Sequence, residues 1–127
     1  MGQVTTNSTN HYEVLRGETV FGIAGGFSGA LTPAGQSLIA MTKEKDAVAL
    51  FTELTKEDSA AARLYGLLGL KTMSLDEFKN ALPAFLANKS PVAVLEGCIR
   101  GNRDVASVAK EVAKGRWSSL LEIKEIR

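Results

Sequence analysis

The sequence has few of the residues from which catalytic and metal sites are usually built. Its 127 residues include one cysteine, Cys98, and one histidine, His11. A single cysteine cannot form a disulfide within the chain, and zinc sites need several Cys and His ligands at close spacing. The dense runs of Asp and Asn that bind calcium are also missing. The sequence therefore predicts no metal ion and no cofactor.

An excess of one charge and long hydrophobic runs are missing too. Fifteen Lys and Arg residues are balanced by fourteen Asp and Glu residues, a formal net charge of +1, so net charge does not steer the protein toward nucleic acid or an anionic membrane. No apolar run reaches the roughly 18 residues of a membrane-spanning helix. With 45% hydrophobic and 23% charged residues, the composition predicts one globular domain, which we expect over residues 11–127.

The first ten residues are polar and without periodicity, which predicts a flexible tail over residues 1–10. Their start fits the pattern for myristoylation of Gly2. We prefer to interpret them as a tether left after removal of an export signal, so that the chain is the mature domain of an exported protein. A cytoplasmic location is the alternative.

The most apolar stretch, Ala60 to Leu70, predicts a helix that the rest of the chain surrounds. Within it Ala62, Gly66 and Gly69 fall at i, i+4 and i+7, a stripe of small residues that lets a neighbouring backbone approach closely. Glycine inside a helix costs about 1 kcal/mol relative to alanine, so close packing is the expected reason for both glycines.

Capping residues and apolar periodicity predict further helices. Their starting signals are Thr32-Pro33, the apolar spacing from Ala47, a capping box at Ser74–Glu77 and Asp104, and a capping box at Thr55–Asp58 leads into the central helix. Pro83 is expected to kink or break the helix that follows Ser74, and Gly115 to end the last one.

Three stretches fit helices less well. Residues 11–23 have an extended pattern, and the glycines from Gly22 to Gly29 lack the motifs of a nucleotide-binding loop, which favours a flexible or tightly turned connector. Pro91 to Ile99 is interpreted as a buried strand rather than a helix, followed by a turn at Gly101-Asn102. Trp117 to Ile126 fits either a closing strand or a terminal helix.

These elements predict a mainly α fold: a compact, single-domain helical bundle of about five short helices. A small two- or three-stranded antiparallel sheet, made from residues 11–23, 92–99 and the C-terminus, is left open. In texture the short helices of residues 32–86 resemble the helical hairpins of HEAT-type and armadillo-type repeats. No repeat of about 40 residues recurs, so this resemblance assigns no family.

Each candidate site has a structural interpretation beside a functional one. Nothing in the spacing brings Cys98 and His11 together as nucleophile and base. Basic residues cluster with Trp117 near the C-terminus, but acidic residues dilute the cluster and no motif for reading nucleic acid is present. Arg63 is expected to pair with a carboxylate and Tyr65 with backbone, or else both line a groove between helices. The basic residues are Arg100, Arg103, Lys110, Lys114 and Arg116.

Our first hypothesis for function is a non-catalytic protein–protein interaction module, such as an adaptor, an inhibitor or an immunity-type protein, with its oligomeric state open. The second is a binder of a small apolar ligand in a pocket between helices. The third and least favoured is a small enzyme that uses Cys98 or a pair of carboxylates. The residues proposed to contact the partner or ligand are Arg63, Tyr65, Phe51, Phe78, Phe85 and Trp117.

Overall fold

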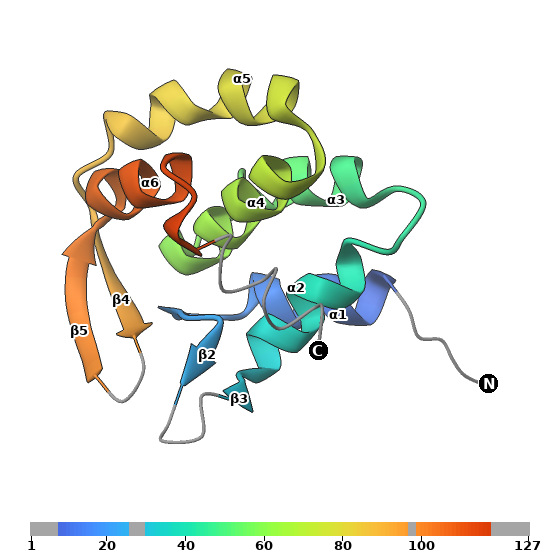
Figure 1. The fold of residues 1–127 in the computed structure, drawn as a ribbon, viewed down its shortest axis with the longest axis horizontal. Helices are drawn as coiled ribbons and strands as arrows, with labels where there is room; N and C mark the ends of the chain where they lie inside the picture. Colours follow the sequence, from blue (N-terminus) through green and yellow to red (C-terminus); the bar gives the residue numbers. More distant parts are fainter. Residues whose placement is uncertain (1–7, 26–29, 97–98, 118–127) are drawn as a thin grey trace.

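A computed structural model describes residues 8–25, 30–96 and 99–117 of the chain (Figure 1). Its helices are α1 (Ser8–Arg16), α2 (Pro33–Met41), α3 (Ala47–Leu54), α4 (Ala60–Met73), α5 (Leu75–Leu86) and α6 (Val105–Ala113). Its strands are β1 (Val20–Phe21), β2 (Ala24–Gly25), β3 (Ala30–Leu31), β4 (Pro91–Glu96) and β5 (Ile99–Asp104). The prediction of a compact, mainly α fold is confirmed. None of the described helices is both long and apolar enough to cross a membrane.

Helix α4 lies at the centre of the molecule, as its composition predicts. It contacts α1, α3, α5, α6, β1 and β4, and Figure 1 shows it between α5 on one side and α1 and α2 on the other. The side chains of Leu64, Leu67 and Leu68 are fully buried. Because neighbours cover every side of α4, its apolar residues need no single stripe.

The glycines of α4 allow α3 to pack closely against it. A Cβ atom at Gly66 would lie 2.7 Å from the carbonyl oxygen of Phe51, and one at Gly69 would lie 2.2 Å from an atom of the Phe51 ring. Real Cβ atoms do not approach neighbours this closely. The predicted close approach along the small-residue stripe is therefore confirmed.

The main sheet has three strands in the order β1-β4-β5. β4 and β5 are antiparallel, with Pro91 opposite Asp104 and Glu96 opposite Ile99, whereas β1 runs parallel to β4. The expectation of a wholly antiparallel sheet is wrong for the β1–β4 pair, because four helices lie between these strands and the chain returns in the same direction. A separate antiparallel pair, β2–β3, joins Ala24 to Leu31.

The expected turn at Gly101-Asn102 is also wrong, because both residues lie inside β5. Pairing with β4, whose Val92 and Val94 are buried, outweighs their turn preference, and an exposed edge tolerates residues that a central strand would not. The strand expected over residues 91–99 is confirmed as far as Glu96. Cys98 and nearly all of the stretch from Trp117 to Ile126 lie outside the described residues.

The N-terminal prediction is corrected as well. Residues 11–16 are helical rather than extended, and α1 begins at Ser8, so the last three residues of the expected tail belong to it. Tyr12 and Leu15 are spaced i and i+3 and both face the core, as in a helix. The segment is so short that this spacing is only a weak signal in the sequence. Residues 1–7 of the expected tail lie outside the described residues.

Most predicted helix starts are confirmed by their hydrogen bonds. The side chains of Thr32, Ser74 and Asp104 accept backbone N–H groups at the starts of α2, α5 and α6. At α4 the capping residue is Ser59, whose hydroxyl accepts the N–H of Ala62, and the expected capping box four residues earlier is wrong because Thr55 ends α3.

Helix α5 continues through Pro83, so of the kink or break expected there the break is wrong and the kink stays a prediction. Pro83 and Lys79 both lie on the exposed side of the helix. Water can therefore hydrate the carbonyl of Lys79, which would otherwise accept an N–H from position 83.

Candidate functional site

The aromatic residues proposed for binding lie in the core. Phe51 and Tyr65 have no exposed surface, Trp117 has 2%, and Phe78 and Phe85 each have 5%. Their packing stabilises the fold: the Phe21 ring, for example, contacts both Tyr65 and Trp117, with centroids 4.8 and 4.7 Å away. The structure does not gather them on one surface, and their role in binding stays a prediction.

Arg63 is half-buried beside the turn that precedes α4. Its guanidinium donates to the carbonyl oxygens of Glu57 and Asp58, at 3.0 and 3.1 Å. The expected carboxylate partner is therefore replaced by two main-chain oxygens. Arg63 holds the turn between α3 and α4 in place.

The hydroxyl of Tyr65 closes the outer edge of β1. It accepts the N–H of Gly22 at 2.9 Å and donates to the carbonyl oxygen of Val20 at 2.8 Å. These two residues alternate with Phe21, so their main-chain groups point away from β4. Burial raises the pKa of Tyr65, so the hydroxyl keeps its proton and can donate at neutral pH. The expected bond between Tyr65 and backbone is confirmed, and it occupies the position that another strand would take.

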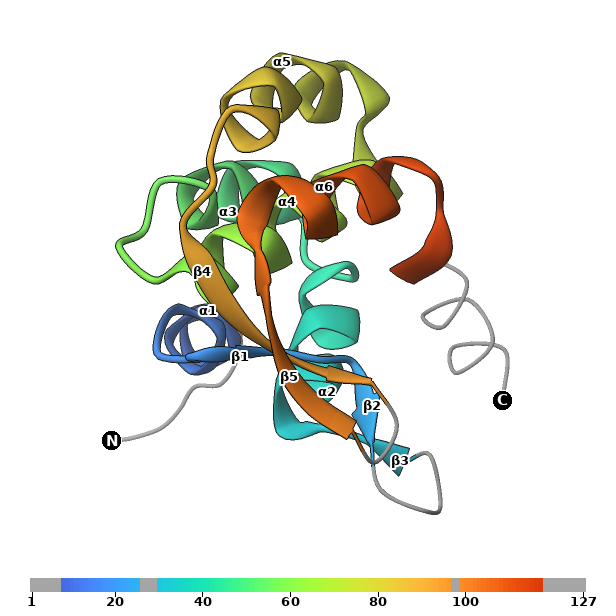
Figure 2. The same ribbon diagram turned by 90° about the vertical axis from the view of Figure 1, so that its left-hand side faces the viewer.

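The opposite edge of the sheet, along β5, is open. The N–H of Val105 donates to the carbonyl oxygen of Ser90 at 2.9 Å. This bond fixes which alternate residues of β5 direct their main-chain groups toward β4. Alternation then directs the main-chain groups of Arg100, Asn102 and Asp104 away from β4. Residues 99–102 are exposed, and no described residue from another element hydrogen-bonds to the main chain of Arg100 or Asn102. Figure 2 shows β5 on the side of the molecule that faces the viewer.

The two faces of β5 differ in character. Ile99, Gly101 and Arg103 share the face of buried Val92 and Val94, and the Ile99 side chain is 74% exposed. A Cβ atom at Gly101 would meet nothing within 4 Å. The edge therefore presents an exposed apolar side chain next to an open space.

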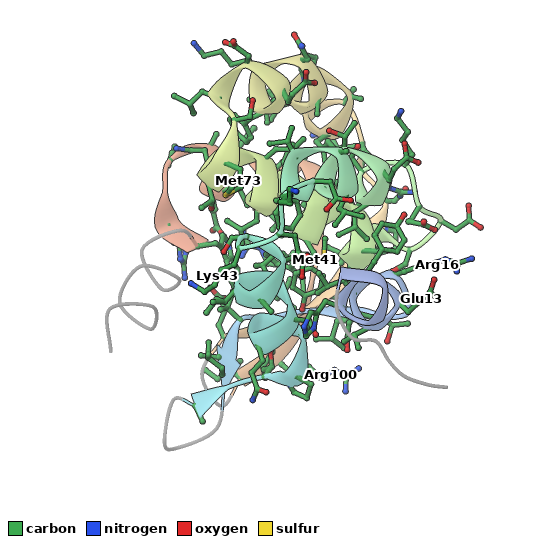
Figure 3. All side chains as sticks on the ribbon, turned by 90° about the vertical axis from the view of Figure 1, so that its right-hand side faces the viewer. Glu13, Arg16, Met41, Lys43, Met73 and Arg100 are labelled. Atoms are coloured by element: carbon green, nitrogen blue, oxygen red, sulfur yellow. The ribbon has the colours of Figure 1, made fainter. Side chains whose placement is uncertain are left out.

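Arg100, Asn102 and Asp104 lie on the other face of the strand. Arg100 projects away from the ribbon in Figure 3 and forms no ion pair with a residue that the structure describes. Asp104 keeps a local role, since its carboxylate accepts the N–H of Ser107 at 2.7 Å, and this hydrogen bond lowers the pKa of Asp104. A positive charge without an ion pair among the described residues and a negative charge thus lie four residues apart on one face.

The other basic residues near β5 are partly neutralised by Glu111 on α6. Its carboxylate accepts from Arg103 at 2.8 Å, from Arg116 at 3.0 Å and from the indole N–H of Trp117 at 3.2 Å. Partial burial alone would raise the pKa of Glu111, but the bonds and charges of both arginines outweigh burial and lower it. Arg116 also pairs with Glu96. Two of the five residues of the predicted basic cluster, Arg103 and Arg116, are thus held in a network within the fold.

Two surface hollows are formed by described residues. One, of about 390 Å³, lies beside β1 and includes Glu18, Thr32, Tyr65, Leu95 and Arg100 in its lining. The other, of about 510 Å³, lies between α3 and α5 and includes Lys45, Glu53 and Glu77. Neither lining includes Phe51, Phe78, Phe85 or Trp117.

Of the candidate catalytic pair, His11 belongs to the described residues and Cys98 lies outside them. His11 lies with its Nδ1 atom 3.2 Å from the hydroxyl oxygen of buried Ser37, which anchors α1 to α2. Glu57, the most engaged carboxylate of this region, accepts from Tyr12 and Arg16. Over residues 8–25, 30–96 and 99–117, no group of three His, Cys, Asp or Glu residues could hold a metal ion.

Sequence reasoning missed the β5 edge because Ile99–Asp104 lacks the alternation of apolar and polar residues that marks a strand. Ile99 is a residue type that favours strands, but its exposure is visible only in the structure. The chain matches no family model, no curated protein and no solved structure, so the function has to be inferred from this geometry.

Proposed function

We propose that the protein is a non-catalytic interaction module, and that it binds another protein chain by adding an extended segment of that chain to the edge of β5. The open edge is the observation that carries this proposal. In strand addition, main-chain hydrogen bonds supply much of the affinity and alternate side chains supply specificity. β5 offers outward main-chain groups at Arg100 and Asn102 and exposed side chains on both faces.

An exposed edge of this kind needs a reason. Proteins usually protect edge strands by shortening them, by covering them or by placing charges and bulges along them, since bare edges promote aggregation. β1 is short and closed by Tyr65, whereas β5 has six residues, and the charged residue of its exposed part, Arg100, has no ion pair with a described residue. Recognition of a partner strand accounts for this difference between the two edges.

The alternative function, a binder of a small apolar ligand, gains no support from the described hollows. Charged side chains contribute to both linings, whereas sites for apolar ligands are lined mainly by apolar groups. We therefore favour the interaction module.

The test uses the full chain with Asn102→Pro, and with Asn102→Ala as the matched control. Proline removes an N–H that points away from β4, so the β4–β5 ladder is kept while strand addition is blocked. Each variant is immobilised and exposed to an extract of the source cells. A recovered protein is identified by mass spectrometry, whether it is a different protein or another copy of this chain, and is then purified for hydrogen exchange on the complex.

We expect recovery with the wild type and Asn102→Ala, loss with Asn102→Pro, and slowed exchange of the Arg100 and Asn102 amides in the complex. Equal recovery by the proline variant, no recovery by any variant, or unchanged exchange at these amides would refute strand addition to β5. Circular dichroism and the fluorescence of the single tryptophan check that each variant is folded.

A further inference from the structure

We infer that the chain which pairs with β5 is a second copy of this protein, so that two β5 strands join antiparallel across a twofold axis. This inference rests on the proposed function, since it names the occupant of the same edge. Most homo-oligomers are twofold dimers, in which one surface meets itself. The registers in which β5 can pair with itself favour such a dimer.

Only residues whose main-chain groups point outward can form the hydrogen-bonded pairs of the new ladder. In β5 these are Arg100 and Asn102, together with the N–H of Asp104, whose carbonyl accepts the first N–H of α6, so a twofold pairing must bring these residues opposite one another. Centring the axis on Arg100 would place the two copies of Arg100 opposite each other. Centring it on Arg103 would place the two copies of Arg103 opposite each other. Like charges directly opposite are destabilising.

Centring the axis on Asn102 gives a complementary arrangement. Each Arg100 then lies opposite Asp104 of the second copy, and the two Asn102 side chains face each other. Arg100 has no ion pair with a described residue, and Asp104 keeps its negative charge because its pKa is lowered. A pairing centred on Gly101 would instead place Arg100 opposite Asn102 and lose both charge pairs.

The opposite face fits the same register. Arg103 lies opposite Gly101 of the second copy, where the missing Cβ atom leaves space because nothing lies within 4 Å. The Arg103 side chain is already held against Glu111 at 2.8 Å, so it brings no uncompensated charge to that face. Ile99, 74% exposed in the monomer, reaches the start of α6 in the second copy and can lose exposed apolar surface there. The result is a continuous six-stranded sheet, three strands from each copy.

Sedimentation equilibrium of the full chain tests the inference, from low micromolar to submillimolar protein. We expect the wild type and Asn102→Ala to form dimers and Asn102→Pro to stay monomeric. Arg100→Glu replaces attraction by repulsion at two exposed pairs, each worth up to about 1 kcal/mol, so it should weaken the dimer about ten-fold or more. Adding Asp104→Asn, which keeps a good capping residue, should recover part of that loss. Lys45→Glu makes the same charge change between α2 and α3 and should have no effect.

A wild type that stays monomeric over this range, or a dimer that persists in Asn102→Pro, would overturn the inference. Equal dimerisation of Arg100→Glu and the wild type would overturn the proposed register. These failures are distinguishable from failure of the proposed function. If the chain is monomeric but captures a different protein that slows exchange of the Arg100 and Asn102 amides, strand addition to β5 is supported. Only the identification of the partner as a second copy is then wrong.

Discussion

Replacing Tyr65 by Phe removes the one oxygen atom that closes the outer edge of β1. The hydroxyl accepts the N–H of Gly22 at 2.9 Å, donates to the carbonyl oxygen of Val20 at 2.8 Å and lies 3.2 Å from the carbonyl oxygen of Gly22. The Tyr65 side chain has no exposed surface. Phenylalanine preserves the ring and its contact with Phe21, whose centroid lies 4.8 Å away. The substitution therefore isolates the hydrogen bonds from the packing.

The expected loss of stability follows from the burial of these groups. A buried N–H left without an acceptor costs about 1–3 kcal/mol, and the carbonyl of Val20 loses its donor as well, so we expect about 3 kcal/mol in total. This is a large part of the roughly 5–15 kcal/mol by which domains of this kind are stable. In urea unfolding with an m value of about 2 kcal/mol/M, the midpoint should fall by about 1.5 M with m unchanged. The fluorescence of buried Trp117 reports the transition.

Tyr12→Phe is the matched control because it removes the same atom from a partly exposed tyrosine. The Tyr12 hydroxyl donates to Glu57, which water can hydrate instead, so we expect a loss below about 1 kcal/mol. Exchange of the Gly22 amide should accelerate in Tyr65→Phe only. If both variants unfold at the same urea concentration, or if Tyr65→Phe loses less than about 1 kcal/mol, the idea that this hydroxyl replaces a strand is wrong.

Two further predictions concern packing and charge. In thermal unfolding, Gly69→Ala should destabilise the protein by about 2 kcal/mol despite alanine's better helix propensity, because the new methyl group would lie 2.2 Å from the Phe51 ring. The control Gly101→Ala places its methyl group in open space and should leave the stability nearly unchanged. Equal effects of the two substitutions would refute the packing argument. The pKa of Glu111 is lower in the folded chain, where Arg103 and Arg116 bond to it, than in the unfolded chain, so its contribution to stability is present above the ordinary pKa of glutamate and is lost as the pH falls through the lowered folded-state pKa. Urea unfolding should therefore show a stability difference between wild type and Glu111→Gln that shrinks over this range, and a difference independent of pH would contradict the role assigned to Arg103.

The parts of the fold that could be predicted from the sequence are those set by neighbours within one helix. The small-residue stripe of α4 and the capping residues Thr32, Ser74 and Asp104 act over three to seven positions, so their spacing is visible in the chain. Ser59 was missed because Thr55 offered a similar pattern four residues earlier. Which of two such patterns starts a helix depends on where the preceding helix ends.

The parts that could not be predicted depend on pairing between distant segments. β1 has two residues and exists because β4 lies beside it, after four intervening helices. β5 follows β4 directly, but its sequence of exposed, polar and glycine residues carries no period of two. For the same reason Tyr65 could be expected to bond to backbone but not to close a sheet edge.

The candidate site was hidden for a related reason. Aromatic residues were the natural candidates for binding, because they dominate the energetics of interfaces, yet a chain with eight of them needs most of them for its own core. What is left for recognition is main chain, one exposed isoleucine and the charges of Arg100 and Asp104. A strand edge needs no distinctive residue type, since its hydrogen-bonding groups belong to every residue.

The contrast between the two edges of one sheet is the strongest argument that β5 binds a partner. The carbonyl of Val20 in β1 and the N–H of Gly22 directly after it point away from β4, and the buried hydroxyl of Tyr65 bonds to both groups. β5 exposes Arg100 and Asn102 in the same way, and no described residue covers them. Unpaired edges promote unwanted association, so proteins usually protect them with a bulge, a proline or a covering segment. An edge strand that has none of these is expected where the protein uses the edge to pair with a partner. The charges along that edge then favour a partner strand with complementary charges, and β5 of a second copy has them in one register.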